Sequence, residues 1–228
     1  GGTSDFTVVR LGPQHAHKSD RSQDILATTG VHIGGTDFDH KLNVAEVQPL
    51  LGLGHHGPTG REVPSRVFYD LSTWHLIQWL YTAKALREAE ALRTDYSDRR
   101  LHARLMRVLQ EQAGHRLADA VEQGKITASS TAATAPLDLG WVEEDLTAAI
   151  SPASLATHLQ LQLADVVRCA EACVAQAELR TDQITALYLT GGSSALQTLR
   201  DALAVAFPAT PQVAGDLFGG VASGLAYA

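Results

Sequence analysis

The sequence predicts an α/β fold that carries a mainly helical inserted subdomain. Strand patterns near both ends of the chain alternate with helical patterns, whereas the middle of the chain reads as helix with few strands. We expect the α/β subdomain over residues 1–33 and 130–228, and the helical subdomain over residues 34–129. The 228 residues, 45% of them hydrophobic, suffice for one large domain or two small ones.

The N-terminal region begins with two strand patterns. Residues 6–11 alternate in the manner of a strand, and residues 25–29 follow as a second strand pattern, so the two segments predict a hairpin. A helix is expected next, with Thr36 or Asp37 as its N-cap and Pro49 at its end.

The middle region is expected to consist of a loop and two long helices. Glycines and prolines mark the loop at residues 52–64, and helical patterns cover residues 71–92 and 99–127. Trp74 and Trp79 fall in the first of these helices. We expect both indole rings in the core, with a surface for a protein partner as the alternative.

The C-terminal half returns to alternating elements. Strands are expected at residues 131–139, 184–189 and 212–214. Helices are expected at residues 143–150, 154–178, 196–207 and 219–228. Such alternation of helices and strands is typical of layered α/β folds.

Charge and cysteine content exclude several classes of protein. Eighteen Lys and Arg against 25 Asp and Glu give a net charge of −7, which repels nucleic acid and anionic membranes. No run of about 18 apolar residues or signal sequence is visible. The two cysteines, Cys169 and Cys173, are expected in the core of a helix. We therefore expect a cytoplasmic protein with no nucleic-acid or membrane partner.

The adjacent histidines of the loop, His55 and His56, are a weak metal motif. Neighbouring positions on a loop rarely direct two imidazoles at one ion, and no HExxH pattern is present. We therefore expect no metal site from this pair.

Three glycine turns are the strongest candidates for a binding site. They lie at residues 1–3, 34–36 and 191–193, each beside a predicted strand. Glycines let a ligand approach the backbone closely, and a following helix N-terminus favours a phosphate. None of the turns matches a P-loop or a dinucleotide fingerprint, so the residues alone leave a structural turn or a phosphate site open.

Five segments resemble a known family in their order along the chain. They are GGTSDFTVV, IGGTDFDHKL, VEQGKITASS, YLTGGSSALQTLRDAL and FGGVASGLA. Together they resemble the second lobe of the actin-like ATPase domain, a ribonuclease H-like fold, of DnaK-type heat-shock chaperones. The spacing is most similar to the YegD-like branch of that family.

The resemblance implies phosphate-binding residues in two of the glycine turns. They are Gly1, Gly2, Thr3, Gly191 and Gly192. In the family, an Asp just upstream of the first turn helps to hold Mg²⁺. The sequence starts without Met on a glycine pair that runs directly into a strand pattern, so we expect it to be a piece of a longer chain in which that Asp precedes Gly1.

The resemblance also implies a nucleoside site. Glu122 and Lys125 match the residues that hydrogen-bond the ribose hydroxyls, and Ser129 matches a serine that contacts adenine. Without the resemblance, Glu122 and Lys125 read as a surface ion pair. The remaining nucleoside residues implied are Gly191, Gly192, Ser193, Ala195 and Asp216, the last after a shift of two positions.

Two positions depart from the family. Where the chaperones sandwich the adenine ring between arginines, this sequence has Ile126 and Ala195. Each lost cation–π contact weakens binding by about 0.5 to 2 kcal/mol. These departures leave open whether adenine is the preferred base.

The function implied is that of a nucleotide-binding lobe of a DnaK-like chaperone that hydrolyses ATP when its domain is complete. The cofactors implied are ATP or ADP with Mg²⁺, and the implied partners are the first ATPase lobe, client proteins and co-chaperones. Two alternatives remain: a degenerate module that binds nucleotide or protein without hydrolysis, and a lobe of a sugar or acetate kinase.

Overall fold

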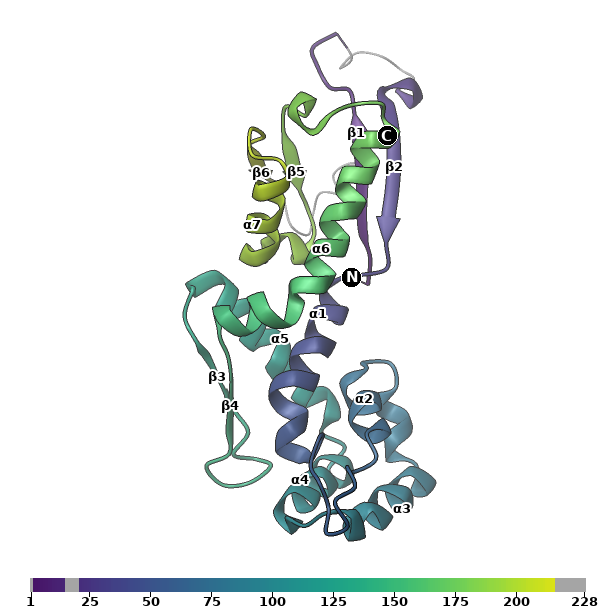
Figure 1. Ribbon diagram of the computed structural model, residues 1–228, viewed down its shortest axis with the longest axis vertical. Coiled ribbons are helices and arrows are strands. Elements are labelled where there is room, and N and C mark those ends of the chain that lie inside the picture. The colour runs from purple at the N-terminus through teal and green to yellow at the C-terminus, as the bar shows by residue number, and fades with distance from the viewer. Residues whose placement is uncertain (1, 15–20, 216–228) are drawn as a thin grey trace. The chain divides into compact units, whose positions relative to one another are not determined.

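The computed structural model describes residues 2–14 and 21–215 of the chain. The chain divides into two compact units (Figure 1). Unit 1 comprises Gly1–Gly35 and Gln160–Ala228, and unit 2 comprises Thr36–Leu159. The helix expected at residues 219–228 lies outside the described residues.

Unit 1 contains the predicted N-terminal hairpin. Strand β1 (Ser4–Val9) pairs antiparallel with β2 (Ile25–Val31), and Ser4 lies opposite Val31. Alternate side chains of β1 are exposed, because polar and apolar residues alternate along it. The sequence pattern thus predicted both the strands and their pairing correctly.

The long helix α6 (Pro152–Gln176) confirms the predicted helix at residues 154–178, and its C-terminal part packs against this hairpin. Cys173 is buried, and its thiol lies 3.4 Å from the carbonyl oxygen of Phe6. Cys169 is half-buried, and its carbonyl oxygen accepts a hydrogen bond of 3.2 Å from Thr29 Oγ1. Both cysteines are free thiols that pack against the hairpin.

The second part of unit 1 is a strand, a glycine turn, a helix and a strand. Strand β5 (Leu187–Leu189) pairs parallel with β6 (Gln212–Ala214), and helix α7 (Gln197–Ala206) connects them. A 3₁₀ turn, Gly192–Ala195, precedes α7. The sequence predicted these elements from a compact apolar run, a glycine turn and an amphipathic helical pattern.

Unit 2 begins with a continuous helical segment of changing pitch. Helix α1 (Gly35–Leu42) continues as a π-helical turn, Asn43–Val47, and a 3₁₀ turn, Gln48–Leu51. Thr36 and Asp37 therefore lie in the first turn of α1, and the predicted N-cap was wrong.

Pro49 does not end this segment, as the sequence had suggested. It occupies the first turn of the 3₁₀ helix, where its missing N–H leaves no bond unmade. The segment ends instead at Gly52, whose φ of 117° most side chains avoid.

The two long helices predicted next are broken into shorter ones. The helices are α2 (Arg66–Ser72), α3 (Ala83–Ala91), α4 (Arg99–Gln110) and α5 (Gly114–Thr131), with 3₁₀ turns at Ile77–Tyr81 and Leu92–Asp95. Thr73 and Thr82 adopt extended backbone at two of the breaks. Thr82 Oγ1 accepts a hydrogen bond of 3.3 Å from Ala85 N, which caps α3.

These breaks explain why the core prediction for Trp74 and Trp79 was wrong. The two residues are 65% and 64% exposed. Because α2 ends before Trp74, the following turn directs Ile77 and Leu80 inward in place of the indole rings. Trp74 meets His115 edge to face, with ring centroids 5.9 Å apart.

A second hairpin in unit 2 replaces the helix predicted at residues 143–150. Strand β3 (Ala135–Asp138) pairs antiparallel with β4 (Thr147–Ile150). The alanines of β4 favour a helix locally, but pairing with β3 and burial of Ile150 decide the outcome. The hairpin packs closely on α5 at Gly124, which has no side chain. A Cβ at this position would lie 2.5 Å from Leu137.

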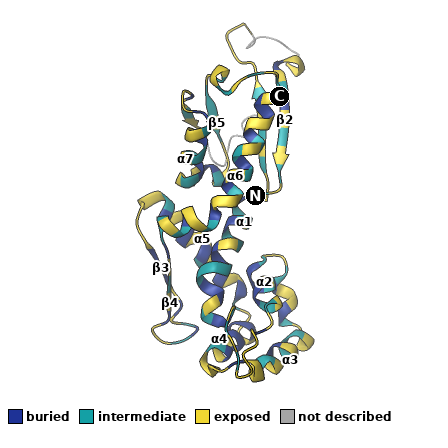
Figure 2. Ribbon diagram, viewed as in Figure 1, coloured by how far each residue is buried: buried dark blue, intermediate teal, exposed yellow. Residues whose placement is uncertain are grey.

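The core of unit 2 consists of large apolar side chains from these helices and the hairpin. Figure 2 marks the buried residues of the ribbon in dark blue. The side chains of this core with less than 2% exposure include Phe38, Leu42, Leu51, Phe68, Leu71, Ile77, Leu105, Leu109, Leu117, Leu139 and Ile150. Burying each stabilises the fold by about 1.5 to 3 kcal/mol. This core fixes α1 and α5 within the same packed unit.

The histidine loop is attached to the start of α4 by His55. The Nε2 atom of His55 accepts hydrogen bonds of 3.2 Å from the backbone N–H groups of Ser97 and Asp98. The imidazole also stacks on Tyr96, with ring centroids 5.8 Å apart. His56 is exposed and contributes its backbone carbonyl, which accepts from Ser97 Oγ. His55 is therefore a structural acceptor.

We predict that His55→Ala lowers the free energy of unfolding by about 1 to 2 kcal/mol, because two N–H groups at the start of α4 lose their acceptor. The matched variant His56→Ala keeps its backbone carbonyl and should change stability by less than about 0.5 kcal/mol. Urea unfolding of both variants checks this. Equal destabilisation by the two substitutions would contradict the role given to His55.

Candidate functional site

The residues that the sequence suggested for a nucleotide site belong to both units. Gly1, Gly2, Thr3, Gly191, Gly192, Ser193, Ala195 and Asp216 belong to unit 1, and Glu122, Lys125 and Ser129 belong to unit 2. Gly1 and Asp216 lie outside the described residues.

Lys125 is the most constrained of these side chains. It lies on α5 and is 8% exposed, which is rare for lysine unless an anion neutralises it. Its Nζ lies 2.7 Å from Asp39 Oδ1, on α1. The side chains of Lys125 and Asp39 retain 10% and 18% of their exposure. The alternative that the sequence left open, a surface ion pair of Lys125 with Glu122, does not fit this burial or this partner.

Glu122 lies one turn before Lys125 on α5 and is exposed. Burial raises the pKa of Asp39, the ammonium of Lys125 partly offsets this increase, and the negative charge of Glu122 adds to it. The three groups thus form one electrostatic cluster with a net charge of −1 when all are ionised. It presents an acceptor at Glu122 and donors at Lys125, which are the groups needed to bind a pair of hydroxyls.

The remaining α5 candidates lie close to this cluster. Ile126 is 48% exposed, and Ser129, one turn later, is half-buried. An exposed apolar side chain beside a polar cluster offers contact area to a flat ligand. Because Ile126 is half exposed, a longer side chain at this position can extend into solvent.

The glycine turn of unit 1 exposes its backbone. Gly191 has a φ of 82°, and a Cβ there would have no heavy atom within 4 Å. The turn is closed by Ser194, whose backbone N–H and hydroxyl donate to the Gly191 carbonyl at 3.1 and 2.7 Å. Gly191, Gly192 and Ala195 are exposed, and Ser193 is half-buried. The turn is therefore rigid but open to a ligand.

The N-terminal candidates precede β1. Gly2 and Thr3 are exposed. The hydroxyl of Thr3 donates a hydrogen bond of 2.9 Å to Asp5 Oδ2. A hydroxyl held in this way can still accept a hydrogen bond from a ligand.

The described part of the chain shows neither a metal cluster nor a membrane-spanning helix. Within residues 2–14 and 21–215, no group of three or more His, Cys, Asp or Glu side chains is placed to hold a metal ion. None of the helices described there has both the length and the apolar character needed to cross a bilayer.

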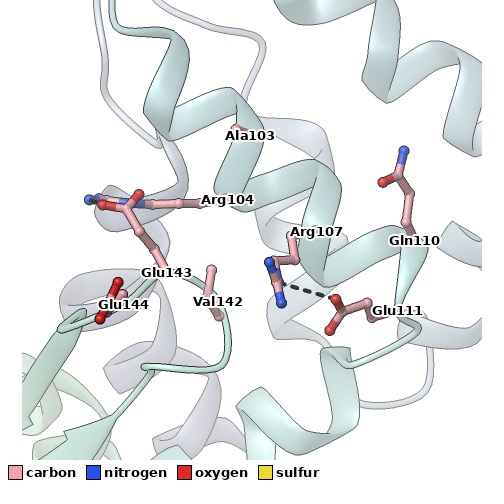
Figure 3. Close-up of a pocket in the computed structure, with 8 residues that line it drawn as sticks. All are labelled: Ala103, Arg104, Arg107, Gln110, Glu111, Val142, Glu143 and Glu144. Carbon is pink, nitrogen blue, oxygen red and sulfur yellow. Dashed lines mark hydrogen bonds and ion pairs between the residues drawn. The ribbon is translucent and has the colours of Figure 1, made fainter.

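A surface pocket of about 470 Å³ lies elsewhere in unit 2, between α4 and the segment that joins β3 to β4 (Figure 3). Glu143 is held there by Arg104, whose Nε and Nη2 donate at 2.7 and 3.0 Å, and by Arg100. These hydrogen bonds lower the pKa of Glu143 to about 2. A second ion pair, Arg107 with Glu111, lines the same pocket. Because four of its charged side chains, Arg104, Glu143, Arg107 and Glu111, are engaged in these ion pairs, we assign the pocket a structural role.

Sequence reasoning missed Asp39 as a site residue. The residue lies within the IGGTDFDHKL segment, but its partner Lys125 follows 86 positions later. No local periodicity links positions so far apart. The one usable signal would have been that Lys125 lies on the buried face of α5. That face can be recognised only once the packing of the β3–β4 hairpin on α5 is known.

The chain matches a model of a known family. The model, described as Hsp70 protein, matches residues 100–227, which is more than half of the chain. The match includes α5 with Glu122 and Lys125, and the glycine turn at residues 191–193. It confirms the predicted fold class, an α/β protein with the actin-like ATPase fold, and the resemblance to DnaK-type chaperones.

The ion pairs of Glu143 generate a prediction about pH. Because the folded-state pKa of Glu143 lies below its ordinary value of 4.5, its contribution to stability is present above that value and is lost as the pH falls toward 2. Glu143→Gln should therefore lower the melting temperature at pH 7, and by less at pH 3. Thermal melts at both values check this. A deficit that grows on acidification would contradict the assignment.

Proposed function

Because this chain belongs to the Hsp70 protein family, we propose that it is a nucleotide-binding lobe of a DnaK-like chaperone of the YegD type. The observation that carries the proposal is the Lys125 ammonium, buried on α5 beside one carboxylate and one turn from the exposed Glu122. A family match that includes these residues supports the same function.

The proposed ligand is ATP or ADP. Glu122 would accept from a ribose hydroxyl and Lys125 would donate to one, because the two residues supply complementary hydrogen-bonding groups. Ser129, Ser193 and the open backbone of Gly191 and Gly192 would contact the nucleoside. We keep Ala195 and Asp216 as further nucleoside residues, the latter from the sequence resemblance alone.

The phosphates would meet the glycine turns. Gly1, Gly2 and Thr3 would donate hydrogen bonds to the terminal phosphates, and Gly191 and Gly192 present backbone without a Cβ in the way. Mg²⁺, when bound with the phosphates, neutralises their charge during transfer to water. Hydrolysis is proposed only for a complete domain, in which the first ATPase lobe supplies the other half of the site.

A second candidate function is a protein-interaction module without hydrolysis. The exposure of Trp74 and Trp79 favours it, because exposed tryptophans are enriched at protein interfaces. Clients or co-chaperones are the partners that this reading would imply. Family membership argues against the third alternative, a sugar or acetate kinase lobe.

Titration calorimetry of the full chain with Mg²⁺ separates these functions. If the proposal holds, ATP and ADP bind more tightly than tripolyphosphate, which carries similar charge but no nucleoside. Equal affinity for ATP and tripolyphosphate would reject a nucleoside site. Absence of binding by all three ligands would favour the protein-interaction module.

We predict that Ala195→Arg improves the affinity for ATP by about two- to thirtyfold, since a cation stacked on adenine contributes about 0.5 to 2 kcal/mol. Ala195 is exposed, so the longer side chain has room. Affinity for tripolyphosphate should stay unchanged. The control Ala204→Arg adds the same charge on an exposed position of α7 and should change neither affinity. Calorimetry with both ligands checks this.

Ile126→Arg should act in the same way from α5. Its effect should add to that of Ala195→Arg only if both arginines contact the same base. If either variant tightened the binding of ATP and tripolyphosphate equally, the added charge would act on the phosphates in general. Added salt would weaken such an effect, because the Debye length is about 10 Å at 0.1 M salt. Equal tightening of both ligands, or no tightening of either ligand, would remove both positions from the adenine site.

A further inference from the structure

We infer that Asp39 is a positioning residue for nucleotide recognition, which holds the ammonium of Lys125 at the place where it meets the ribose. The sequence resemblance gave roles to Glu122 and Lys125, whereas Asp39 emerges only from the structure. The inference rests on the nucleotide-binding function proposed above. In this inference, Glu122 contacts the sugar directly, and Asp39 acts on the sugar through Lys125.

The first support is the geometry of the pair. A free lysine side chain samples many rotamers, and fixing it on binding a ligand lowers affinity. Here Asp39 Oδ1 contacts Nζ at 2.7 Å, and only 10% of the lysine side chain is exposed. Lys125 is therefore held in one arrangement before any ligand arrives.

The second support is the balance of charge. Burying an ammonium without a neighbouring anion is costly, and a charged donor makes a stronger hydrogen bond to a hydroxyl than a neutral donor does. Asp39 supplies the anion from a neighbouring helix. An ammonium has three donor hydrogens, so a contact with one carboxylate oxygen leaves donors for a ligand.

The third support is the packing on either side of the pair. Asp39 follows Phe38, which is 1% exposed, and Lys125 follows Gly124, where a Cβ would collide with Leu137 at 2.5 Å. Neither helix can shift far without opening the core. Asp39 is therefore anchored well enough to fix the position of Lys125.

The test compares ATP with tripolyphosphate in Asp39→Asn, a variant of nearly equal size that lacks the charge. We expect the dissociation constant for ATP to rise by about tenfold, as on weakening one charged hydrogen bond, with that for tripolyphosphate unchanged. In a Lys125→Met background, Asp39→Asn should cause no further loss. The control Asp165→Asn breaks an exposed ion pair with Arg168 and should alter neither ligand.

The outcomes distinguish this inference from the proposed function. Equal weakening of ATP and tripolyphosphate by Asp39→Asn would show a general structural effect and overturn the positioning role. Loss of ATP affinity in Lys125→Met but not in Asp39→Asn would overturn it as well, while leaving the nucleotide site in place.

A second measurement applies even if the unaltered protein binds no nucleotide. Urea unfolding of Asp39→Asn, Lys125→Met and the double variant forms a cycle that reports the coupling of the pair. A double variant that loses less stability than the sum of the single losses supports an Asp39 that holds Lys125. Additive losses would show that the two side chains do not interact and would overturn the positioning role of Asp39.

Discussion

The contact between Asp39 and Lys125 is the interaction on which the rest of the proposed site depends. It joins α1 to α5 at positions where both side chains are largely shielded from water. Removing one member of such a pair typically lowers stability by about 3 to 5 kcal/mol, because the other charge is left buried. That loss is large against the net stability of about 5 to 15 kcal/mol typical of a folded protein.

The surroundings of the pair explain how unit 2 sustains it. The β3–β4 hairpin covers α5 through Leu137 and Ile150, and Gly124 allows the close approach. This apolar packing stabilises the unit, while the ion pair selects one arrangement of the polar side chains within it. Glu122 remains exposed at the edge and keeps the cluster accessible to a ligand.

Local patterns predicted the parts of the fold whose shape is decided locally. The hairpin at the N-terminus, the long helix α6 and the glycine turn before α7 follow from alternation, length and glycine placement. Strand β4 was missed because its pairing with β3 overrides its local preference for helix. The exposure of Trp74 and the contact of Asp39 with Lys125 depend on tertiary packing, which periodicity within one segment does not encode. The resemblance supplied candidate residues, and the structure supplied their neighbours.

The central claim is that the Lys125 ammonium contacts the sugar of a nucleotide. The chain has four lysines, so the nitrogen resonance of each side chain can be followed by magnetic resonance after selective labelling of lysine. Adding adenosine diphosphate with Mg²⁺ should shift the Lys125 Nζ resonance, and adding pyrophosphate should leave it in place. If the nucleotide binds while the Lys125 resonance stays unchanged, or if pyrophosphate shifts it equally, the claim is contradicted.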